Sequence, residues 1–530
     1  MAGEARIPVW REISASPPPA GGAVEQAPLV IVGGGPIGLA LALDLGRRGH
    51  PIILLNKLEY IAAGSRSICI SKRSLDIFDR LGVGQAMVDK GVTWNIGKVF
   101  RGSGEAPIYE FDLLPVKAQK RPAFVNIQQY HVEERLFEAL AKLPNVALRW
   151  GHEVVGVATA GEGMRIEVEA GGTAYSIMAD WLIACDGSHS TVRQKLGLDF
   201  AGRAFEDNFL IADIRMKQER PAERWFWFDP PFNQCRSALL HKQPDDVWRL
   251  DFQLGPDIDR ATCLRPENVE PYVRAMLGDE VEFSEEWYSV YTFQCRRMDR
   301  FVHGRTVFAG DSAHLVSPFG ARGCNGGIAD VDNLGWKLDL VLRGAAPASL
   351  LDSYDLEATI AADENILNAT RATDFMTPQS AGSQALRDAV LELAERHAFA
   401  RPFVNSGRLS TAIDYPDSPL STADREPWHS GIEPGAPAVD APLGDGWLLE
   451  RLGDRFVLLA EQWGGPVPEG VELVDIARVD GDLGILRQRY GLEAGSAYLL
   501  RPDQYVAARW RSPDRAQVEA ALQRATGVLS

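Results

Sequence analysis

The sequence predicts an α/β protein: a Rossmann-like nucleotide-binding domain that is interrupted by an antiparallel β-sheet and followed by a smaller C-terminal domain. Three observations support this fold class. A glycine-rich turn follows an apolar strand near the N-terminus, further strand-to-turn units end at Asp186 and Asp311, and the segment between those two units alternates aromatic with polar residues. Strands that alternate with helices indicate a parallel sheet, whereas an alternation of period two is typical of strands with one buried face.

The first strand-to-turn unit carries a dinucleotide-binding pattern. Its expected elements are a strand over 29–32, a helix over 36–48 and a second strand over 52–55. The turn between them reads Gly33-Gly34-Gly35-Pro36-Ile37-Gly38. Glycines spaced in this way permit a tight turn, bring the backbone close to a pyrophosphate and let the helix pack on the strand, while N–H groups at the helix start attract phosphate. We therefore expect a dinucleotide site here, with a simple packing turn as the alternative.

Asn56 departs from this pattern. An acidic residue usually ends the second strand and binds the ribose hydroxyls, and Asn56 occupies that position. Asparagine can form one such hydrogen bond without charge. Glu59 is a nearby substitute, and a turn-opening role for Asn56 is the other interpretation.

Composition limits the partners and the compartment. The chain has 530 residues and a net charge of −17, which argues against nucleic acid and against an anionic membrane surface as partners. Its six cysteines are scattered, without the spacing of a disulfide-exchange or metal site, so no metal is expected. No secretory signal precedes residue 28, and the uncharged run 27–43 is better explained by a buried strand and helix than by a membrane span. We expect a reduced, cytoplasmic protein.

Further candidate ligand-binding residues follow along the chain. Arg66 lies in a loop at the end of a nucleotide-domain unit, Gln129 stands at the start of a helix expected over 130–143, and Asp186 and Asp311 each follow a strand. In open α/β sheets ligands bind at the carboxyl ends of the strands, so these units are expected to contact one extended ligand. The glycine-rich loop 317–325 leads into another helix, whose N-terminus suits negative charge such as that of a reduced flavin.

The expected domain boundaries follow from changes in composition. A flexible arm is expected over 1–27, nucleotide-binding segments over 28–200 and 301–432, a β-sheet domain over 201–300, and a C-terminal domain over 433–530. The aromatic runs of the β-sheet domain are expected to roof an aromatic pocket. The C-terminal domain reads as β-α-β-β-α with one further strand near 471–476, which resembles a thioredoxin fold. No cysteine follows Cys324, so disulfide exchange is excluded.

These motifs together resemble the FAD-dependent aromatic hydroxylases of the para-hydroxybenzoate hydroxylase fold, especially the branch with a C-terminal thioredoxin-like domain. That branch includes phenol hydroxylase, 3-(3-hydroxyphenyl)propionate hydroxylase and polyketide hydroxylases. The glycine turn at 33–38, the CDG sequence at 185–187 and the GD pair at 310–311 occur in the family's order. The segment P-F-G-A-R-G-C-N-G-G from Pro318 is also typical of the family.

The resemblance implies a role for each matching position. The glycine turn would hold the FAD pyrophosphate, Asn56 would take the place of the ribose ligand, and Asp311 would bind the ribitol chain. Arg66 and Gln129 would contact the flavin, and Asp186 would lie near the pyrophosphate and serve nicotinamide use. The residues implied to line the isoalloxazine ring are Pro318, Gly320, Gly323, Cys324 and Asn325.

The implied reaction is aromatic hydroxylation. NADH or NADPH would reduce FAD, O2 would give a flavin C4a-hydroperoxide, and a phenolic ring would take up its distal oxygen. Arg66 and Arg322 are the expected catalytic residues, with Arg322 stabilising negative charge. The catalytic aspartate of phenol hydroxylase has no counterpart, because Ile68 stands at its position. The remaining candidates for a general base are Tyr288, Tyr291, His241 and His314.

Several alternatives stay open from the sequence. Trp225-x-Trp227-x-Asp229-Pro230 nearly matches the W-x-W-x-I-P motif of flavin halogenases, but Asp229 replaces its isoleucine. A polyketide- or antibiotic-modifying monooxygenase would share every motif named above, and a non-catalytic flavin-binding scaffold is the remaining alternative. The expected partners are a small aromatic substrate and O2. The substrate itself, the choice between NADH and NADPH, and a homodimeric state are undetermined.

Overall fold

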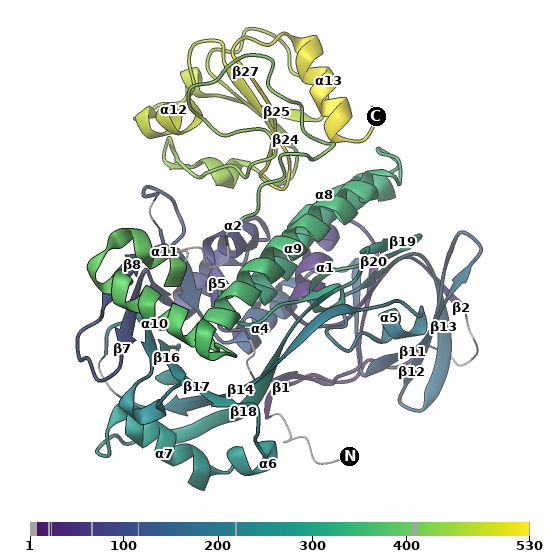
Figure 1. Cartoon of the computed structure of the whole chain (residues 1–530). Helices are drawn as coiled ribbons and strands as arrows, with labels where there is room; N and C mark the ends of the chain where they lie inside the picture. The colour runs from purple at the N-terminus through teal and green to yellow at the C-terminus, as the bar shows by residue number, and fades with distance from the viewer. Residues whose placement is uncertain are drawn as a thin grey trace.

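A computed structural model describes residues 8–19, 22, 24–64, 67–114, 116–217, 220–404 and 411–528 of the chain. Arg66, an expected site residue, lies outside these described residues. In Figure 1 a first sheet with its helices occupies the centre and right of the view, and a second sheet lies at the lower left. The C-terminal domain, drawn in yellow, sits above the helices of the first sheet.

The first sheet has eight strands, in the order β10-β3-β2-β13-β12-β11, with β20 beside β13 and β19 beside β20. The strands are β2 (Val24–Val32), β3 (Ile52–Asn56), β10 (Val146–Trp150), β11 (His152–Ala160), β12 (Gly163–Ala170), β13 (Thr173–Ala184), β19 (Val302–His303) and β20 (Thr306–Phe308). The strands β10, β3, β2, β13 and β20 run parallel. The expected α/β class is confirmed, and the loops after these strands meet at one edge of the sheet.

Helix α1 lies at the centre of this layer. It spans Pro36–Arg47 and packs against α4 (Gln129–Leu140) and α8 (Gly323–Leu342). Proline at its first position suits a helix start, and its leucines and alanines are almost completely buried against the sheet. A Cβ on Gly335 of α8 would lie 1.9 Å from Asp44 Oδ2 of α1, so glycine permits this close approach. The shorter helices α2 (Lys72–Arg80), α3 (Gly84–Lys90) and α5 (Thr191–Lys195) complete the layer.

The second sheet also has eight strands, in the order β21-β18-β14-β17-β16-β15-β7-β8. The strands are β7 (Ile96–Arg101), β8 (Tyr109–Asp112), β14 (Ala201–Arg215), β15 (Arg224–Phe228), β16 (Ser237–Lys242), β17 (Val247–Gly255), β18 (Ser284–Arg297) and β21 (His314–Leu315). An antiparallel sheet confined to 201–300 is therefore wrong in one respect, since β15 pairs in parallel with β7 from the first part of the chain. This pairing satisfies the open edge of β15.

The two faces of the second sheet pack against different helices. The outer face contacts α7 (Pro266–Leu277), which follows the short α6 (Arg260–Cys263). The inner face packs against α9 (Leu350–Met376), α10 (Ala381–Arg396) and Phe319. The aromatic run 225–228 divides between them: Trp225 and Trp227 lie with the outer cluster, whereas Phe226 and Phe228 lie with the inner one. Only half of this run can therefore roof a pocket between the sheets.

Two small sheets connect the layers. One is formed by β5 (Cys69–Ser71), β9 (Phe124–Asn126) and β6 (Val92–Trp94). The other pairs β1 (Val9–Glu12) with β4 (Tyr60–Ala62). The expected loose arm over 1–27 is thus wrong for the described part of that segment, because β1 finds a partner strand and β2 already begins at Val24. No helix of the described residues is long and apolar enough to cross a membrane.

The C-terminal domain has the secondary-structure elements that the sequence predicts. Its mixed sheet has the order β25-β24-β26-β27, with β24 parallel to β25 and antiparallel to β26. Its elements are β24 (Phe456–Ala460), β25 (Val471–Asp475), α12 (Gly484–Tyr490), β26 (Ala497–Leu500), β27 (Val506–Trp510) and α13 (Arg515–Ala525). The short strands β22 (Pro442–Leu443) and β23 (Gly446–Trp447) come before them. The short helix α11 (Arg401–Val404) follows α10, before this domain begins.

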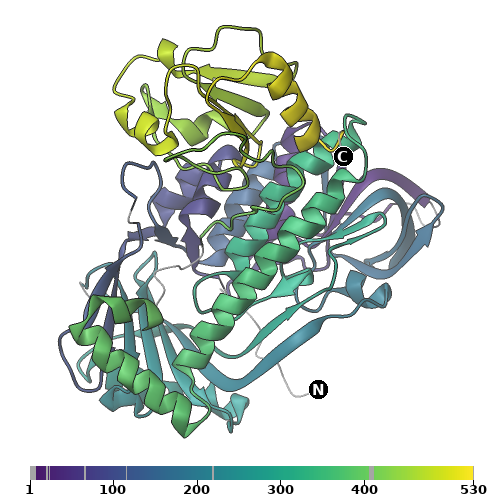
Figure 2. The same ribbon diagram turned by 45° about the horizontal axis from the view of Figure 1, so that its top comes forward.

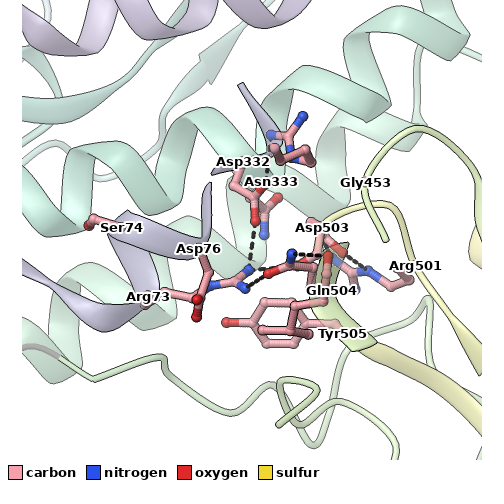
Figure 3. A network of polar contacts seen from close by, with 12 residues as sticks. Arg73, Ser74, Asp76, Asp332, Asn333, Gly453, Arg501, Asp503, Gln504 and Tyr505 are labelled. Carbon is pink, nitrogen blue, oxygen red and sulfur yellow. Dashed lines mark hydrogen bonds and ion pairs between the residues drawn. The ribbon is translucent and has the colours of Figure 1, made fainter. Parts of the chain in front are cut away.

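A buried ionic network joins the C-terminal domain to α2, α8 and α9. Figure 2 shows the domain lying against the helices of the first sheet, and Figure 3 shows the part of the network around Arg73, Asp332 and Asp503. Arg73 of α2 donates to Asp332 Oδ2 of α8 at 2.6 Å and to the Asp503 carbonyl at 2.6 Å. Arg501 forms a bidentate pair with Glu357 of α9, at 2.6 and 2.9 Å, and Glu357 also accepts from Lys337. The side chains of Arg501 and Glu357 are completely buried. Breaking such a pair on one side leaves a buried charge uncompensated.

Candidate FAD-binding and substrate site

The glycine turn combines tight packing with one open position. Gly33 has a φ of +114°, and a Cβ on it would lie 2.2 Å from the carbonyl oxygen of Cys185. A Cβ on Gly38 would lie 2.0 Å from the Gly33 carbonyl oxygen. Gly35, in contrast, has an ordinary φ of −80° and no atom within 4 Å of an added Cβ. Space is therefore open beside Gly35, at the start of a helix that has no side-chain cap.

Asn56 ends β3 next to this turn. Its Oδ1 accepts a hydrogen bond from the Gly34 N–H at 3.2 Å, and its Nδ2 lies 3.5 Å from the Leu58 carbonyl. A Cβ on Gly34 would lie 2.7 Å from Asn56 Cγ. Asn56 thus supports the turn directly, in addition to lying where the sequence pattern expects a ribose ligand.

The three strand-to-turn units meet, as expected from parallel strands. The Cys185 N–H donates to the Val32 carbonyl at 2.7 Å, and the Ala309 N–H donates to the Ala184 carbonyl at 3.1 Å. A Cβ on Gly310 would lie 2.9 Å from Ile37 Cγ1, so the third turn packs on the first. Asp311 follows in a short 3-10 turn, Gly310–Ser312, and is exposed.

Asp186 contributes a half-buried carboxylate to this edge. Its Oδ2 accepts from the Val192 N–H of α5 at 3.1 Å. Its Oδ1 is buried and has no hydrogen-bond partner in the described part of the chain. Burial raises the pKa of Asp186, although the hydrogen bonds it accepts oppose that rise. A buried oxygen without a partner is costly, so a ligand or water is expected to satisfy it.

Gln129 belongs to a compact cluster at the start of α4. Its Oε1 accepts from the Ser67 N–H at 3.2 Å, and its Nε2 donates to Glu133 Oε1 at 2.8 Å. Burial raises the pKa of Glu133 to about 7, although the hydrogen bond from Gln129 lowers it. Burial also raises the pKa of the nearby Cys324 thiol to about 12, against a smaller opposing effect of a hydrogen bond with Ser67. The structure therefore brings Gln129 and Cys324 together, through their shared neighbour Ser67.

The loop before α8 has one face against the second sheet. Phe319 is buried, and its ring centroid lies 5.3 Å from that of Phe209 and 5.2 Å from that of Phe293. Pro318 is exposed, and Gly320 adopts a φ of +96°. Arg322, the residue before α8, is buried and donates from Nη1 to Asn365 Oδ1 of α9 at 3.1 Å. Gly323 begins the helix.

Asn325 ties α8 to the neighbouring elements. Its Oδ1 accepts from the Ser71 N–H at 2.9 Å and from Ser74 Oγ at 2.7 Å. Its Nδ2 donates to the carbonyl oxygens of Cys69 at 2.9 Å and Ala321 at 2.6 Å. The amide is engaged within the protein on both sides, so Asn325 orients the start of α8.

Comparison with known proteins identifies the family. A family model described as "FAD binding domain" matches residues 26–369. A 12-dehydrotetracycline 5-monooxygenase/anhydrotetracycline 6-monooxygenase from Streptomyces rimosus is 30% identical over 380 residues, covering 69% of this chain and 73% of that protein. The chain belongs to the FAD-binding monooxygenases.

Two further comparisons extend over almost the whole monooxygenase. A 3-(3-hydroxy-phenyl)propionate/3-hydroxycinnamic acid hydroxylase from Mycolicibacterium gilvum is 27% identical and covers 91% of this chain and 88% of that protein. The crystal structure of the flavin-dependent monooxygenase PieE, in complex with FAD and substrate, superposes with a TM-score of 0.80 at 22% identity. It covers 96% of this chain and 99% of that chain. The C-terminal domain is thus included in the shared fold.

The residues of this monooxygenase fit FAD. The open space beside Gly35 and the uncapped start of α1 suit a pyrophosphate, because helix N-termini attract anions. The partnerless Asp186 Oδ1 lies at the same edge of the sheet, in the strand-to-turn unit beside the glycine turn. With the protein carrying a net charge of −17, the backbone N–H groups of the glycine turn and of the start of α1 must hold the phosphates. Of the two expected catalytic arginines, Arg322 is described above, and Arg66 lies outside the described residues.

The four candidates for a general base occupy different environments in the monooxygenase. Tyr288 lies in the outer cluster of the second sheet, where burial raises its pKa to about 12. Tyr291 packs with the inner cluster. His314 Nε2 lies 2.7 Å from Asp330 Oδ2; burial lowers the pKa of His314, but Asp330 outweighs burial and raises it overall. Burial and Arg224 lower the pKa of His241 to about 4, so at neutral pH His241 alone of these four combines an uncharged imidazole with a place on the inner face.

Sequence reasoning missed two residues, Glu133 and Arg224. Glu133 lies four residues after Gln129 on the same helix, and this spacing could have indicated a side-chain contact. Arg224 opens the aromatic run of β15, where a charged residue among buried aromatics is itself a signal. The contact between Arg224 and Cys69 of β5 depends on how two distant segments pair, and no local pattern encodes that.

Proposed function

We propose that this monooxygenase hydroxylates a phenolic aromatic substrate with NADH or NADPH and O2. The observation that carries the proposal is the meeting of the loop 317–322 with the inner face of the second sheet, through the Phe319, Phe209 and Phe293 rings. Aromatic rings and a few polar groups on one sheet face suit an aromatic ligand beside a flavin. The names of the relatives, which include a hydroxylase of phenolic acids and a tetracycline monooxygenase, support it.

The site residues receive the following roles in this proposal. The glycine turn and the start of α1 hold the pyrophosphate, Asn56 and Asp311 bind the ribose and ribitol hydroxyls, and Asp186 binds near the pyrophosphate. The residues beside the flavin ring are Arg66, Gln129, Pro318, Gly320, Gly323, Cys324 and Asn325. When bound, FAD accepts electrons from the nicotinamide and activates O2 for transfer of one oxygen atom.

The protein has two tasks toward the substrate. The buried rings of Phe209, Phe293 and Phe319 exclude water from the side of the second sheet. Arg322 is a buried cation at the start of α8 and favours negative charge that develops on the flavin. His241 is the proposed acceptor for the phenolic proton, since its imidazole is neutral at pH 7 and neither ring nitrogen has a hydrogen-bond partner among the described residues.

The deciding experiment is NADH and NADPH oxidation by the FAD-loaded protein across a panel of phenols, with hydroxylated product and hydrogen peroxide measured together. We expect one class of phenol to stimulate oxidation with product equal to the cofactor consumed. Stimulation that gives only peroxide would mean that the phenol triggers reduction without being the substrate. Absence of product with every aromatic compound, while FAD stays reducible, would contradict the proposal.

A polycyclic substrate is the second candidate, and the 30% identity to a tetracycline monooxygenase favours it. Anhydrotetracycline and simpler polycyclic phenols therefore belong in the panel. Product from these compounds alone would move the substrate class from single-ring phenols to polyketides.

We propose in addition that residues 433–530 form a thioredoxin-like domain with no redox role. Support comes from the strand order β25-β24-β26-β27 with α12 and α13, and from the absence of cysteine after Cys324. The proposed division of the rest places the FAD-binding domain in 28–200 and 301–432 and the substrate domain around 201–300 with β7 and β8. All six cysteines are free thiols, which is consistent with work in the reducing cytoplasm.

A further inference from the structure

A row of polar side chains crosses the inner face of the second sheet. Arg224 of β15 is the register partner of His241 of β16, and His241 is the partner of Arg249 of β17. Arg249 in turn pairs with Asp213 of β14. Side chains of directly paired residues point to the same face of a sheet, so the four form one continuous line. All four are at least nine-tenths buried, with exposures of 5%, 1%, 3% and 3%.

Only one of the two arginines in this row has an ionic partner. Arg249 binds Asp213 through two hydrogen bonds of 2.7 Å each. Arg224 donates from Nη1 to the Cys69 sulfur at 3.7 Å, and its Nε has no partner in the described residues. No carboxylate of the described residues lies within salt-bridge distance of Arg224. Burial lowers the pKa of Arg224, and the more distant Asp251 opposes this only in part. The rings of Phe226 and Trp94, at 4.9 and 5.9 Å, are its other neighbours.

The neighbouring polar groups are unsatisfied as well. Neither ring nitrogen of His241 has a hydrogen-bond partner among the described residues, although Nε2 lies 3.4 Å from Asp251 Oδ2. Gln243 is two residues further on and 1% exposed, and neither its amide oxygen nor its amide nitrogen has a described partner. Buried polar atoms usually find partners, so this group of donors and acceptors is prepared for a ligand.

The cluster lies close to the loop that we assign to the flavin. Cys69 belongs to an apolar group with Ile68, Trp94 and Ala321, and Ala321 lies in the loop before α8. Arg224 contacts two members of this group, Cys69 and Trp94. Ile68 stands where phenol hydroxylase has its catalytic aspartate, so this position offers no carboxylate that could neutralise Arg224. A buried cation with no directly bonded carboxylate is destabilising, and a bound anion would offset that cost.

We propose that Arg224 holds an anionic oxygen of the aromatic substrate beside His241, with Gln243 as a further hydrogen-bond partner. This inference rests on the proposed function and names its substrate class: a phenol that carries a carboxylate, or a phenol bound as phenolate. Arginine offers only donors and is permanently charged, so a neutral ligand would leave its charge buried and uncompensated. The apolar wall of Ile68, Trp94 and Phe226 receives the carbon skeleton.

The test measures ligand binding to the FAD-loaded protein by the change in the flavin absorption spectrum. The probes are 3-(3-hydroxyphenyl)propionate, its primary amide of the same shape, and 4-nitrophenol, whose phenolate is coloured. We expect one of the two anions to bind about 10- to 100-fold more tightly than the amide, as a charged hydrogen bond provides. Preference for the propionate assigns the anion to a carboxylate, and a colour change of bound 4-nitrophenol assigns it to a phenolate.

Arg224→Met should abolish this preference and leave the affinity for the amide unchanged. Its thermal midpoint should stay the same or rise, because the variant removes an unpaired buried charge, whereas a structural arginine would cause a fall. Arg224→Lys should keep part of the preference, and it decides the matter if the methionine variant fails to retain flavin. Arg215→Met, on the same sheet in an exposed pair with Glu286, is the matched control and should change neither quantity.

Equal affinity for the anions and the amide in the unmodified protein, absence of saturable binding by either anion, or an anion preference that survives Arg224→Met would overturn the inference. Hydroxylation of neutral phenols without anion preference would leave the proposed function intact and remove only the inference. Anion binding through Arg224 without any hydroxylated product would support the inference and contradict the proposed function.

Discussion

At Asp311 the structure joins a fold requirement to a proposed ligand contact. Gly310 must be small because its Cα faces Ile37 of α1, and Asp311 then emerges exposed at the edge of the sheet. We predict that Asp311→Ala purifies without flavin, because loss of a charged hydrogen bond weakens FAD binding by about 10- to 100-fold. The ratio of flavin to protein absorbance measures this. Asp299→Ala, at an exposed aspartate, should retain flavin, and full flavin in Asp311→Ala would remove the assignment.

Glu133 predicts a pH dependence of stability. Burial raises its pKa from 4.5 to about 7, so the folded protein binds this proton more tightly than the unfolded chain does. The stabilising contribution is fully present below pH 4.5 and is lost as the pH rises to about 7, by at most about 3 kcal/mol. Glu133→Gln should lack this loss, so its thermal midpoint should gain on the unmodified protein across that pH range. For Glu138→Gln, at a more exposed position on α4, the plot of thermal midpoint against pH should run parallel to that of the unmodified protein. A Glu133→Gln plot that is also parallel to the unmodified protein would refute the prediction.

At the scale of elements, the glycine turn separates folding from cofactor binding. We predict that Gly35→Ala folds with an unchanged thermal midpoint when FAD is absent, since its φ is ordinary and no atom lies within 4 Å of the new Cβ. The methyl group would occupy the space that we assign to the pyrophosphate, so FAD affinity should fall by more than about 10-fold, the cost of one lost charged contact. Differential scanning fluorimetry and a flavin titration measure the two effects.

Gly33→Ala is the contrasting variant. Its Cβ would lie 2.2 Å from a backbone oxygen at a φ of +114°, so the apoprotein itself should be destabilised. Similar thermal midpoints for the two alanine variants would contradict this account of the turn.

The turns and the elements beside them could be predicted because each is encoded in a few adjacent residues. The helix expected over 36–48 and the strands expected over 52–55 and 471–476 end within one residue of the observed ones, although β2 begins five residues before the expected position 29. Contacts between distant segments could not be predicted. The pairing of β15 with β7 satisfies a sheet edge that many segments could fill, and the row from Arg224 to Asp213 exists only because four strands share one register.

At the scale of the whole molecule, the C-terminal domain is held to α9 by buried charges. We predict that Arg501→Met destabilises the protein by about 3 to 5 kcal/mol, because Glu357 would keep only Lys337 as a cationic partner and Asp503 would lose its bidentate donor. The fall in thermal midpoint of the FAD-loaded protein is the measurement. Arg511→Met, in a more exposed pair with Glu493, should shift the midpoint little. Equal shifts for both variants would show that the buried network does not stabilise the protein more than an exposed ion pair does.

Because the second sheet interrupts the first in the sequence, the parts of the first sheet are synthesised at different times. Strand β2 ends at Val32, but β20 begins only at Thr306, and α8, which packs on α1, follows at Gly323. At about 5 to 20 residues per second, a ribosome takes about 15 to 55 s to make the intervening chain. Throughout that interval the glycine turn lacks the third strand-to-turn unit on which it packs. The FAD site that we propose between these units can therefore be completed only late in translation or after release.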